Sequence, residues 1–361
     1  MTRRAIVATA VTGLIACASA SPASAATKTM DVGGHGFRGA PENLQALAFL
    51  RSVVSVHVGD RVNFHILGGL IHTVTFVPPG QSIPSLAALD PAHPVSGVTD
   101  ANGTPFWFNG QPRPILNPIA AFPTVRRTVT GRAFVNSGIP SDQAKGMRFR
   151  VTFPKAGTFK FVCLVHPGMF GTVKVLPRSR HIPSRAQDAA AAKRQIAAIV
   201  NAANAKAKLP VPVGQVDVGR TGPRLTINAM FPATTTVKAG HAVTFTMTGQ
   251  SSFEIHTVTF GPDSVTAPIE NSFITPVPNT TGPPTLVINP LAAFPSDPPP
   301  TIPPYTGSNH GNGFLNAAGI LDNDPATPQP NSAAVTFATP GTYHYECVIH
   351  PNMDGTVVVT P

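Results

Sequence analysis

The sequence predicts an all-β protein built from two Greek-key β-sandwich domains that are joined by a helical linker. Short segments of alternating apolar and polar residues occur in both halves, separated by turns that use many of the 40 prolines and 31 glycines, and there is no βαβ rhythm. Matching motifs recur 184 residues apart, which indicates that the two halves follow one plan. A single stretch between them has strong helix propensity.

The first element, residues 1–25, is typical of an export signal. Two arginines precede an apolar run, and small residues at 23–25 form the end of the segment. The residues before Cys17 also fit a lipoprotein cleavage box, which would leave Cys17 as a lipidated N-terminus. Free secretion (or release to a periplasm) and lipoprotein anchoring therefore remain alternatives, and both place the mature chain outside the cytoplasm. Because only Cys163 and Cys347 remain in it, no disulfide framework is expected.

The two sandwich domains are predicted over residues 26–176 and 211–361. Within them, Ser52–Phe64 and Thr234–Phe245 alternate apolar and polar residues around internal turn residues. This pattern is typical of β-hairpins, so we expect one hairpin at each of these places.

The linker, residues 177–210, is basic and rich in alanine. A capping box at 184–187 predicts where its helix begins, and prolines bracket the segment. We expect a solvated helical spacer. The alternative is a helix that packs on one sandwich through a narrow apolar stripe of Ile196, Ile199 and Val200.

Two loops carry the residues that point to a bound metal. They read Cys-Leu-Val-His-Pro-Gly-Met at 163–169 and Cys-Val-Ile-His-Pro-Asn-Met at 347–353, and a His-Thr-Val-Thr-Phe segment precedes each of them, at 72–76 and 256–260. Two imidazoles, one thiolate and a weak thioether suit both Cu(I) and Cu(II), whereas zinc more often takes several thiolates or a water. The two predicted copper sites consist of His72, Cys163, His166 and Met169, and of His256, Cys347, His350 and Met353.

At these residues the chain resembles the cupredoxins, or blue type 1 copper proteins, and particularly the bacterial plastocyanin/azurin-like group. The short Cys-x-x-His-x-x-Met spacing is similar to that of amicyanin and its relatives. The resemblance extends over the strands before each cysteine, at 151–163 and 335–347, and over the strands that enter each upstream histidine. It implies the Greek-key sandwich fold and one type 1 copper in each half. The distance from His72 to Cys163 is longer than in a minimal member of the family, because each half carries an insert.

The inserts cover about 80–145 and 262–332 and share a seven-residue phrase, Asn-Pro-x-Ala-Ala-Phe-Pro, at 117–123 and 289–295. Asparagine as N-cap and proline at the first helical position predict one short helical turn that buries the phenylalanine of the phrase. We expect ordered structure that packs on the sandwich. A lid over the copper or a surface for a partner is the alternative.

Catalysis is not expected. None of the 12 histidines forms the His-x-His pairs on which trinuclear oxidase centres are built, and Val162 and Glu346 stand where copper nitrite reductases place a histidine before the copper cysteine. We therefore predict an exported electron-transfer protein, not an enzyme, with His166 and His350 as solvent-facing electron ports. A cell-surface copper-binding or storage protein without a redox partner is the alternative, and a two-domain copper oxidoreductase is a third possibility.

Charge is distributed unevenly along the chain. Residues 26–176 carry 14 Lys and Arg against 6 Asp and Glu, the linker 7 against 1, and residues 211–361 only 3 against 9. The basic first half and linker predict an acidic redox partner protein, with an anionic wall polymer or a membrane surface as further candidates. Nucleic acid is not expected as a partner because the chain has no binding motif for it.

Overall fold

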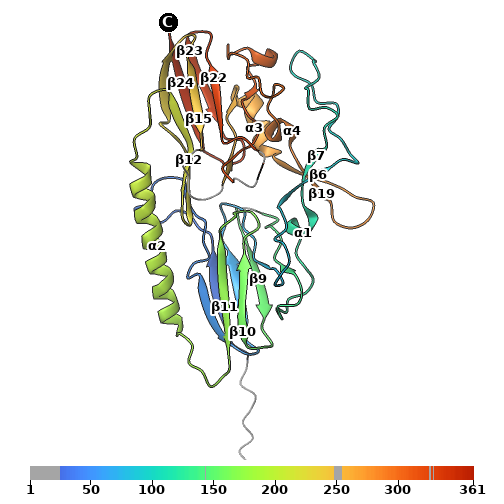
Figure 1. Ribbon diagram of the computed structural model, residues 1–361, viewed down its shortest axis with the longest axis vertical. Coiled ribbons are helices and arrows are strands. Elements are labelled where there is room, and N and C mark those ends of the chain that lie inside the picture. The colour runs from blue at the N-terminus through green and yellow to red at the C-terminus, as the bar shows by residue number, and fades with distance from the viewer. Residues whose placement is uncertain (1–24, 143, 248–253, 325–326, 328) are drawn as a thin grey trace, which may run out of the picture.

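The computed structural model describes residues 25–142, 144–247, 254–324, 327 and 329–361. The predicted export signal therefore lies, apart from Ala25, outside the described residues. Two bodies of β-sheet lie one above the other along the long axis, and the long helix α2 (Arg185–Ala207) runs beside them (Figure 1). No helix within the described ranges is long and apolar enough to cross a membrane.

The first sandwich packs a three-stranded sheet against a five-stranded sheet, and the core between them is rich in valine and phenylalanine. The rings of Phe64 and Phe161, one from each sheet, meet edge to face with centroids 5.0 Å apart. The smaller sheet has the order β1 (Thr27–Val32), β4 (Arg61–Ile66), β9 (Met147–Thr152). The larger has the order β3 (Val53–His57), β11 (Phe170–Leu176), β10 (Gly157–Val162), β5 (Thr75–Phe76), β8 (Val135–Asn136).

The second sandwich repeats this arrangement with two five-stranded sheets around a separate core. Phe245 and Tyr345 from its two sheets make the corresponding ring contact, also at 5.0 Å. One sheet has the order β2 (Leu44–Ala46), β13 (Leu225–Phe231), β12 (Gln215–Gly222), β15 (Ala242–Thr246), β22 (Ser332–Thr336). The other has the order β14 (Thr234–Lys238), β24 (Asp354–Thr360), β23 (Gly341–Glu346), β17 (Thr259–Phe260), β20 (Leu315–Asn316). The prediction of two β-sandwiches joined by a helix is confirmed.

The two expected hairpins are wrong, although their strands exist. β3 and β4 lie in opposite sheets, where β3 pairs in parallel with β11 and β4 pairs in parallel with β1. In the second half β14 and β15 are likewise separated between the two sheets. Alternation shows that one face of a strand is buried, and strands on either side of one core satisfy it as well as neighbours in one sheet do.

Helix α2 is not surrounded by solvent, so the expected spacer is also wrong. Its capping box forms, and the apolar stripe packs on the second sandwich. Asp188 on the same helix forms an ion pair with Lys28 of the first sandwich, with Oδ2 and Nζ 2.7 Å apart. The buried part of the stripe, Ile199 and Val200, and the nearby Ala203 contact a cluster that includes Leu44, Ala46, Leu225 and Ile227. That cluster exists because β2, from the first half, pairs with β13 of the second.

The inserts are ordered and pack on each other. β7 (Arg113–Leu116) and β19 (Thr285–Ile288) meet in a four-stranded sheet with the order β18 (Ile274–Val277), β19, β7, β6 (Ala87–Asp90). The second insert also contains helix α3 (Asp263–Asn271) and the short 3-10 helix η1 (Asn309–Gly311). A mixed aromatic cluster joins the inserts, and Trp107 Nε1 donates a hydrogen bond to the Pro295 carbonyl at 2.9 Å.

The shared seven-residue phrase forms the predicted helical turn in both inserts, as α1 (Pro118–Ala121) and α4 (Pro290–Ala293), each capped by its asparagine. The phenylalanines that follow are only half-buried, and the fully buried residues are Ala120, Ala121 and Ala292. The small alanine side chains allow the turn to lie close to the underlying strands, so the larger phenylalanine rings lie at the edge.

Candidate metal centres

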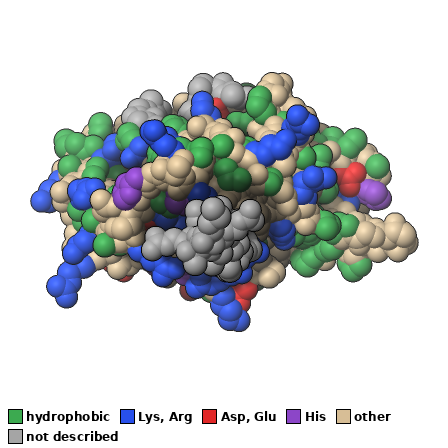
Figure 2. Space-filling model, turned by 90° about the horizontal axis from the view of Figure 1, so that it is seen from below, with side chains coloured by type: hydrophobic (Ala, Val, Ile, Leu, Met, Phe, Trp, Pro, Cys, Tyr) green, Lys and Arg blue, Asp and Glu red, His purple; other side chains and the backbone are tan. Residues whose placement is uncertain are grey.

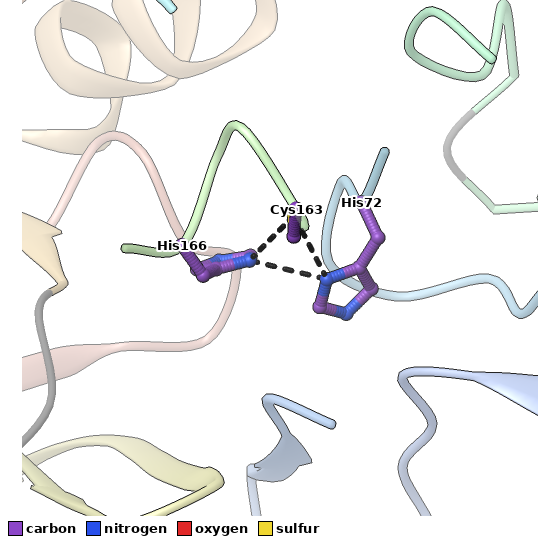
Figure 3. A group of neighbouring side chains, drawn as sticks. All are labelled: His72, Cys163 and His166. Atoms are coloured by element: carbon purple, nitrogen blue, oxygen red, sulfur yellow. Dashed lines mark hydrogen bonds between the residues drawn. The ribbon is translucent and has the colours of Figure 1, made fainter. Parts of the chain in front are cut away.

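Two clusters of metal-binding side chains form, one in each sandwich. In the first, Cys163 Sγ lies 3.9 Å from His72 Nδ1 and 3.7 Å from His166 Nδ1, and the two Nδ1 atoms are 3.1 Å apart (Figure 3). In the second, Cys347 Sγ lies 3.7 Å from Nδ1 of both His256 and His350, and the two nitrogens are 3.0 Å apart. The six side chains are buried, and each set places its ligand atoms within 4.8 Å of one another.

The size of these triangles fits a metal ion. An ion at the centre of either would lie about 2 Å from all three atoms, which is the range of bonds from first-row metals to imidazole nitrogen and thiolate sulfur. All four histidines present Nδ1 to the cluster, so the proton of each neutral ring belongs on Nε2. In each cluster, two nitrogens and one thiolate form a trigonal set. The two clusters are therefore consistent with two type 1 copper sites.

The loop after each cysteine is tied back on itself by the backbone. Cys163 lies directly after β10, its N–H donates to the Met169 carbonyl at 2.9 Å, and Met169 N–H donates to the His166 carbonyl at 3.1 Å. Cys347 and Met353 make the same 2.9 Å bond. This compact turn brings the cysteine and the next histidine to one side, and it buries both methionines in the cores that contain their cysteines.

A threonine next to each upstream histidine holds the cysteine loop in place. Thr73 N–H donates to Cys163 Sγ at 3.4 Å, and its Oγ1 accepts from Leu164 N–H at 2.8 Å. Thr257 does the same for Cys347 and Val348, at 3.4 and 3.0 Å. Hydrogen bonds to the sulfur stabilise its thiolate form. These threonines belong to the repeated His-Thr-Val-Thr-Phe segment, so their repetition in register was the signal in the sequence that could have identified them, although they are not metal ligands.

The network continues from the metal loop into the insert. Thr73 Oγ1 lies 3.2 Å from Thr75 Oγ1, and Thr75 Oγ1 donates to Asn136 Oδ1 at 2.8 Å. The amide of Asn136 donates to the carbonyls of the short helix α1, among them that of Ala120 at 2.8 Å. Asn316 binds α4 in the same way. The shared phrase of the inserts therefore supports the metal loops from behind.

Glycines leave room for the two upstream histidines. Gly33 and Gly219 both have positive φ, +71° and +70°, and a Cβ at these positions would lie 2.3 Å from His72 Nε2 and 2.5 Å from His256 Nε2. Real Cβ contacts do not come this close, so only glycine permits the observed ring positions.

The structure corrects the expected electron ports. His166 and His350 are 2% and 5% exposed, and their outer nitrogens face the interior instead of solvent. Both point at one carboxylate, that of Glu254, which is 5% exposed. Oε2 lies 3.6 Å from His166 Nε2 and Oε1 lies 3.8 Å from His350 Nε2. Glu254 was not predicted as a site residue, because its counterpart 184 residues earlier is Leu70.

Burial sets the protonation states in the metal-free clusters. Desolvation lowers the pKa of His72 to about 3 and that of His350 to about 4. It also lowers the pKa of His256 and His166 well below the ordinary value. The nearby His72 and His350, the latter from the other site, lower the pKa of His166 further. The pKa of Cys163 is raised and that of Cys347 rises to about 11, again through burial. Metal uptake must therefore displace a thiol proton at each site.

These shifts predict that the metal-free protein loses stability in acid. Below pH 6.5 the unfolded chain protonates these four histidines while the folded protein does not, so the free energy of unfolding falls as the pH drops toward 4, by up to ~1.4 kcal/mol per pH unit for each histidine. Glu254, whose pKa burial raises to about 8, acts in the opposite sense between pH 8 and 4.5, as does His310, whose pKa its hydrogen bond to Asp297 raises. Glu270 and Asp322, whose pKa values burial also raises, act in this opposite sense too. Together the four fully buried histidines outweigh these groups. Melting temperatures of metal-free protein at pH 7, 6, 5 and 4 test this, and a flat profile would contradict it.

Comparison with known proteins finds similarity only among solved structures. No family model matches the chain and no curated protein sequence is similar to it. The reduced Cu(I) form at pH 4 of an amicyanin variant is 16% identical, with a TM-score of 0.22, over 44% of this chain and 88% of that one. A reduced variant is 17% identical (TM-score 0.22; 42% and 82% covered), and an oxidised one 14% identical (TM-score 0.21; 44% and 88% covered). At these scores the matches assign neither fold nor activity to this chain.

Proposed function

We propose that the protein is an exported, non-enzymatic electron carrier with two mononuclear type 1 copper sites. The observation that carries the proposal is the pair of separate, buried His-Cys-His clusters of matching geometry, each followed on its loop by a buried methionine. Copper bound in such a set accepts or releases one electron with little rearrangement. Its ligands would be the eight residues that the sequence predicts, with the methionines on the axial side.

The surroundings of the sites favour electron transfer over catalysis on a substrate. The ligand side chains are held by backbone hydrogen bonds, by Thr73 and Thr257, and by close-packed glycines, so the clusters are rigid. The hollow that borders Met169 and Phe170 has a volume of about 20 Å³, which is too small for an organic substrate. An electron can pass through the packed side chains that cover the cluster, whereas an organic reactant cannot reach it.

Voltammetry of the copper-loaded protein tests the function. We expect two reversible one-electron waves, and Met169→Leu and Met353→Leu should each raise the potential of their own site, because loss of a weak axial donor disfavours Cu(II) more than Cu(I). The blue colour should persist in both variants. Potentials that stay unchanged would show that neither methionine is an axial ligand. Very slow electron exchange with reversible metal release would favour the copper-storage alternative.

For the partner, we propose an acidic redox protein that meets the first half of the chain outside the cytoplasm. Lysine and arginine side chains are spread over the lower end of the molecule (Figure 2), in keeping with the basic composition of residues 26–176 and the linker. The same charge would suit an anionic wall polymer or membrane surface. Since His166 is buried, we place the point of electron entry at Phe170, which is 66% exposed and follows Met169 directly.

This placement predicts a salt-dependent reaction. Electron exchange with an acidic redox protein should slow as ionic strength rises, and Phe170→Glu should slow it several-fold through like-charge repulsion at the contact. Asp354→Lys, at the matching position of the second half, is the control and should have a smaller effect. Stopped-flow rates at several salt concentrations measure both. A rate indifferent to salt would move the contact elsewhere.

A further inference from the structure

Glu254 lies between the two metal-binding clusters and belongs to neither. It directly precedes β16 (Ile255–His256), the strand that ends in a ligand of the second site and pairs with β21 (Leu321–Asp322). Its own N–H donates to Asn323 Oδ1 at 3.0 Å, and its Oε1 accepts from the N–H of Ile255 at 3.0 Å. The backbone therefore fixes where this carboxylate lies.

The carboxylate faces the outer nitrogens of two ligand histidines from different sandwiches. Nδ1 of His166 and of His350 point at their clusters, so each ring has its N–H on Nε2, toward Glu254. The separations of 3.6 and 3.8 Å are slightly longer than a hydrogen bond, and a small rotation of the side chain closes either. Oε2 has no hydrogen-bond donor among the described residues, so it is available for such a bond. A carboxylate in this position fixes ring orientation and raises ligand basicity.

This arrangement is not duplicated along with the rest of the chain. The ligands repeat in register, but Leu70, a buried apolar residue, stands where a second carboxylate would be. A buried carboxylate is costly unless a cation or hydrogen-bond donors compensate it. The Nε2–H groups of the two ligand histidines, one on each side, are the donors that face it, and a single carboxylate serves both.

We propose that Glu254 couples the two metal sites into one unit, as the shared positioning residue of His166 and His350. The proposal rests on the proposed function, in that both clusters bind copper. By linkage, copper binding at one site then changes the copper affinity of the other site, and the effect is reciprocal. With copper bound in both clusters, His166, Glu254 and His350 would lie between the two metals and could carry one electron from a reduced to an oxidised site without breaking a bond.

Copper(I) affinities of single-site proteins test whether Glu254 supports both sites, and the coupling itself predicts that the affinity of each site differs between the single-site and the two-site protein. Cys347→Ser leaves only the first site and Cys163→Ser only the second, and Glu254→Leu is added to each. We expect about tenfold or greater loss of affinity at both sites, measured by competition with a chromophoric chelator. Glu254→Gln keeps an acceptor of the same shape and should lose less. Glu270→Gln removes a half-buried carboxylate elsewhere and is the control, with no change expected.

A second measurement separates positioning from mere loss of packing. In the diamagnetic Cu(I) protein, the Nε2–H resonances of both His166 and His350 should shift together in Glu254→Leu and remain near their original positions in Glu254→Gln. A change confined to the second site, in affinity or in resonances, would overturn the inference. The single-site proteins with Glu254 intact test the proposed function separately. A lack of copper binding in them would overturn the proposed function and not this inference.

Discussion

Replacing Cys163 with serine should remove one of two bound coppers and about half of the visible absorption. The intense orange-red band of a type 1 site arises from charge transfer between thiolate and copper, and an alcohol supplies neither that transition nor comparable affinity for copper. Cys347→Ser should do the same for the second site, since its cluster has the same geometry. Metal analysis and a visible spectrum of the copper-loaded protein measure both quantities.

The double variant provides the reference, because it should bind no copper with a visible band. Loss of all absorption in either single variant would show that the two clusters are not independent chromophores. Zinc in both sites of copper-loaded protein would contradict the assignment of the metal.

Gly33→Ala and Gly219→Ala should each abolish copper binding at one site only. A Cβ at Gly33 would lie 2.3 Å from His72 Nε2, and a Cβ at Gly219 would lie 2.5 Å from His256 Nε2, so each imidazole must leave its position in the trigonal set. A displacement of about 1 Å is enough to break a bond of roughly 2 Å to the metal. Copper content should fall by half in each variant, with the corresponding share of the absorption.

Strain and steric contact are separated by matched controls. Gly36 and Gly240 also have positive φ, +66° and +84°, but a Cβ on either meets no atom within 4 Å. Gly36→Ala and Gly240→Ala therefore carry the backbone strain alone, about 1–2 kcal/mol, and should keep both coppers. Equal loss of copper in all four variants would show that backbone strain causes the effect. It would contradict the proposed steric contact between the added Cβ and the histidine ring.

The ligand sets could be predicted from the sequence because the chemistry is local. Cysteine, histidine and methionine share a seven-residue loop, and a second copy of it 184 residues later makes coincidence improbable. The short helical turns of the inserts were predictable for the same reason, since the asparagine cap and the following proline act within one turn. The export signal and the exact domain boundaries remain predictions.

How distant segments pack on one another needed the tertiary structure. Alternation in Ser52–Phe64 showed that its strands are half-buried but not that they lie in opposite sheets, and nothing in Leu44–Ala46 shows that it completes a sheet of the other half. The sequence by itself determined which side chains could bind copper, because three ligands of each set are neighbours along the chain and the upstream histidine repeats in register with them. Only the packing of one sandwich on the other decided that His166 and His350 turn away from solvent toward Glu254, because burial and the partners of a side chain depend on segments that the chain brings together from far apart.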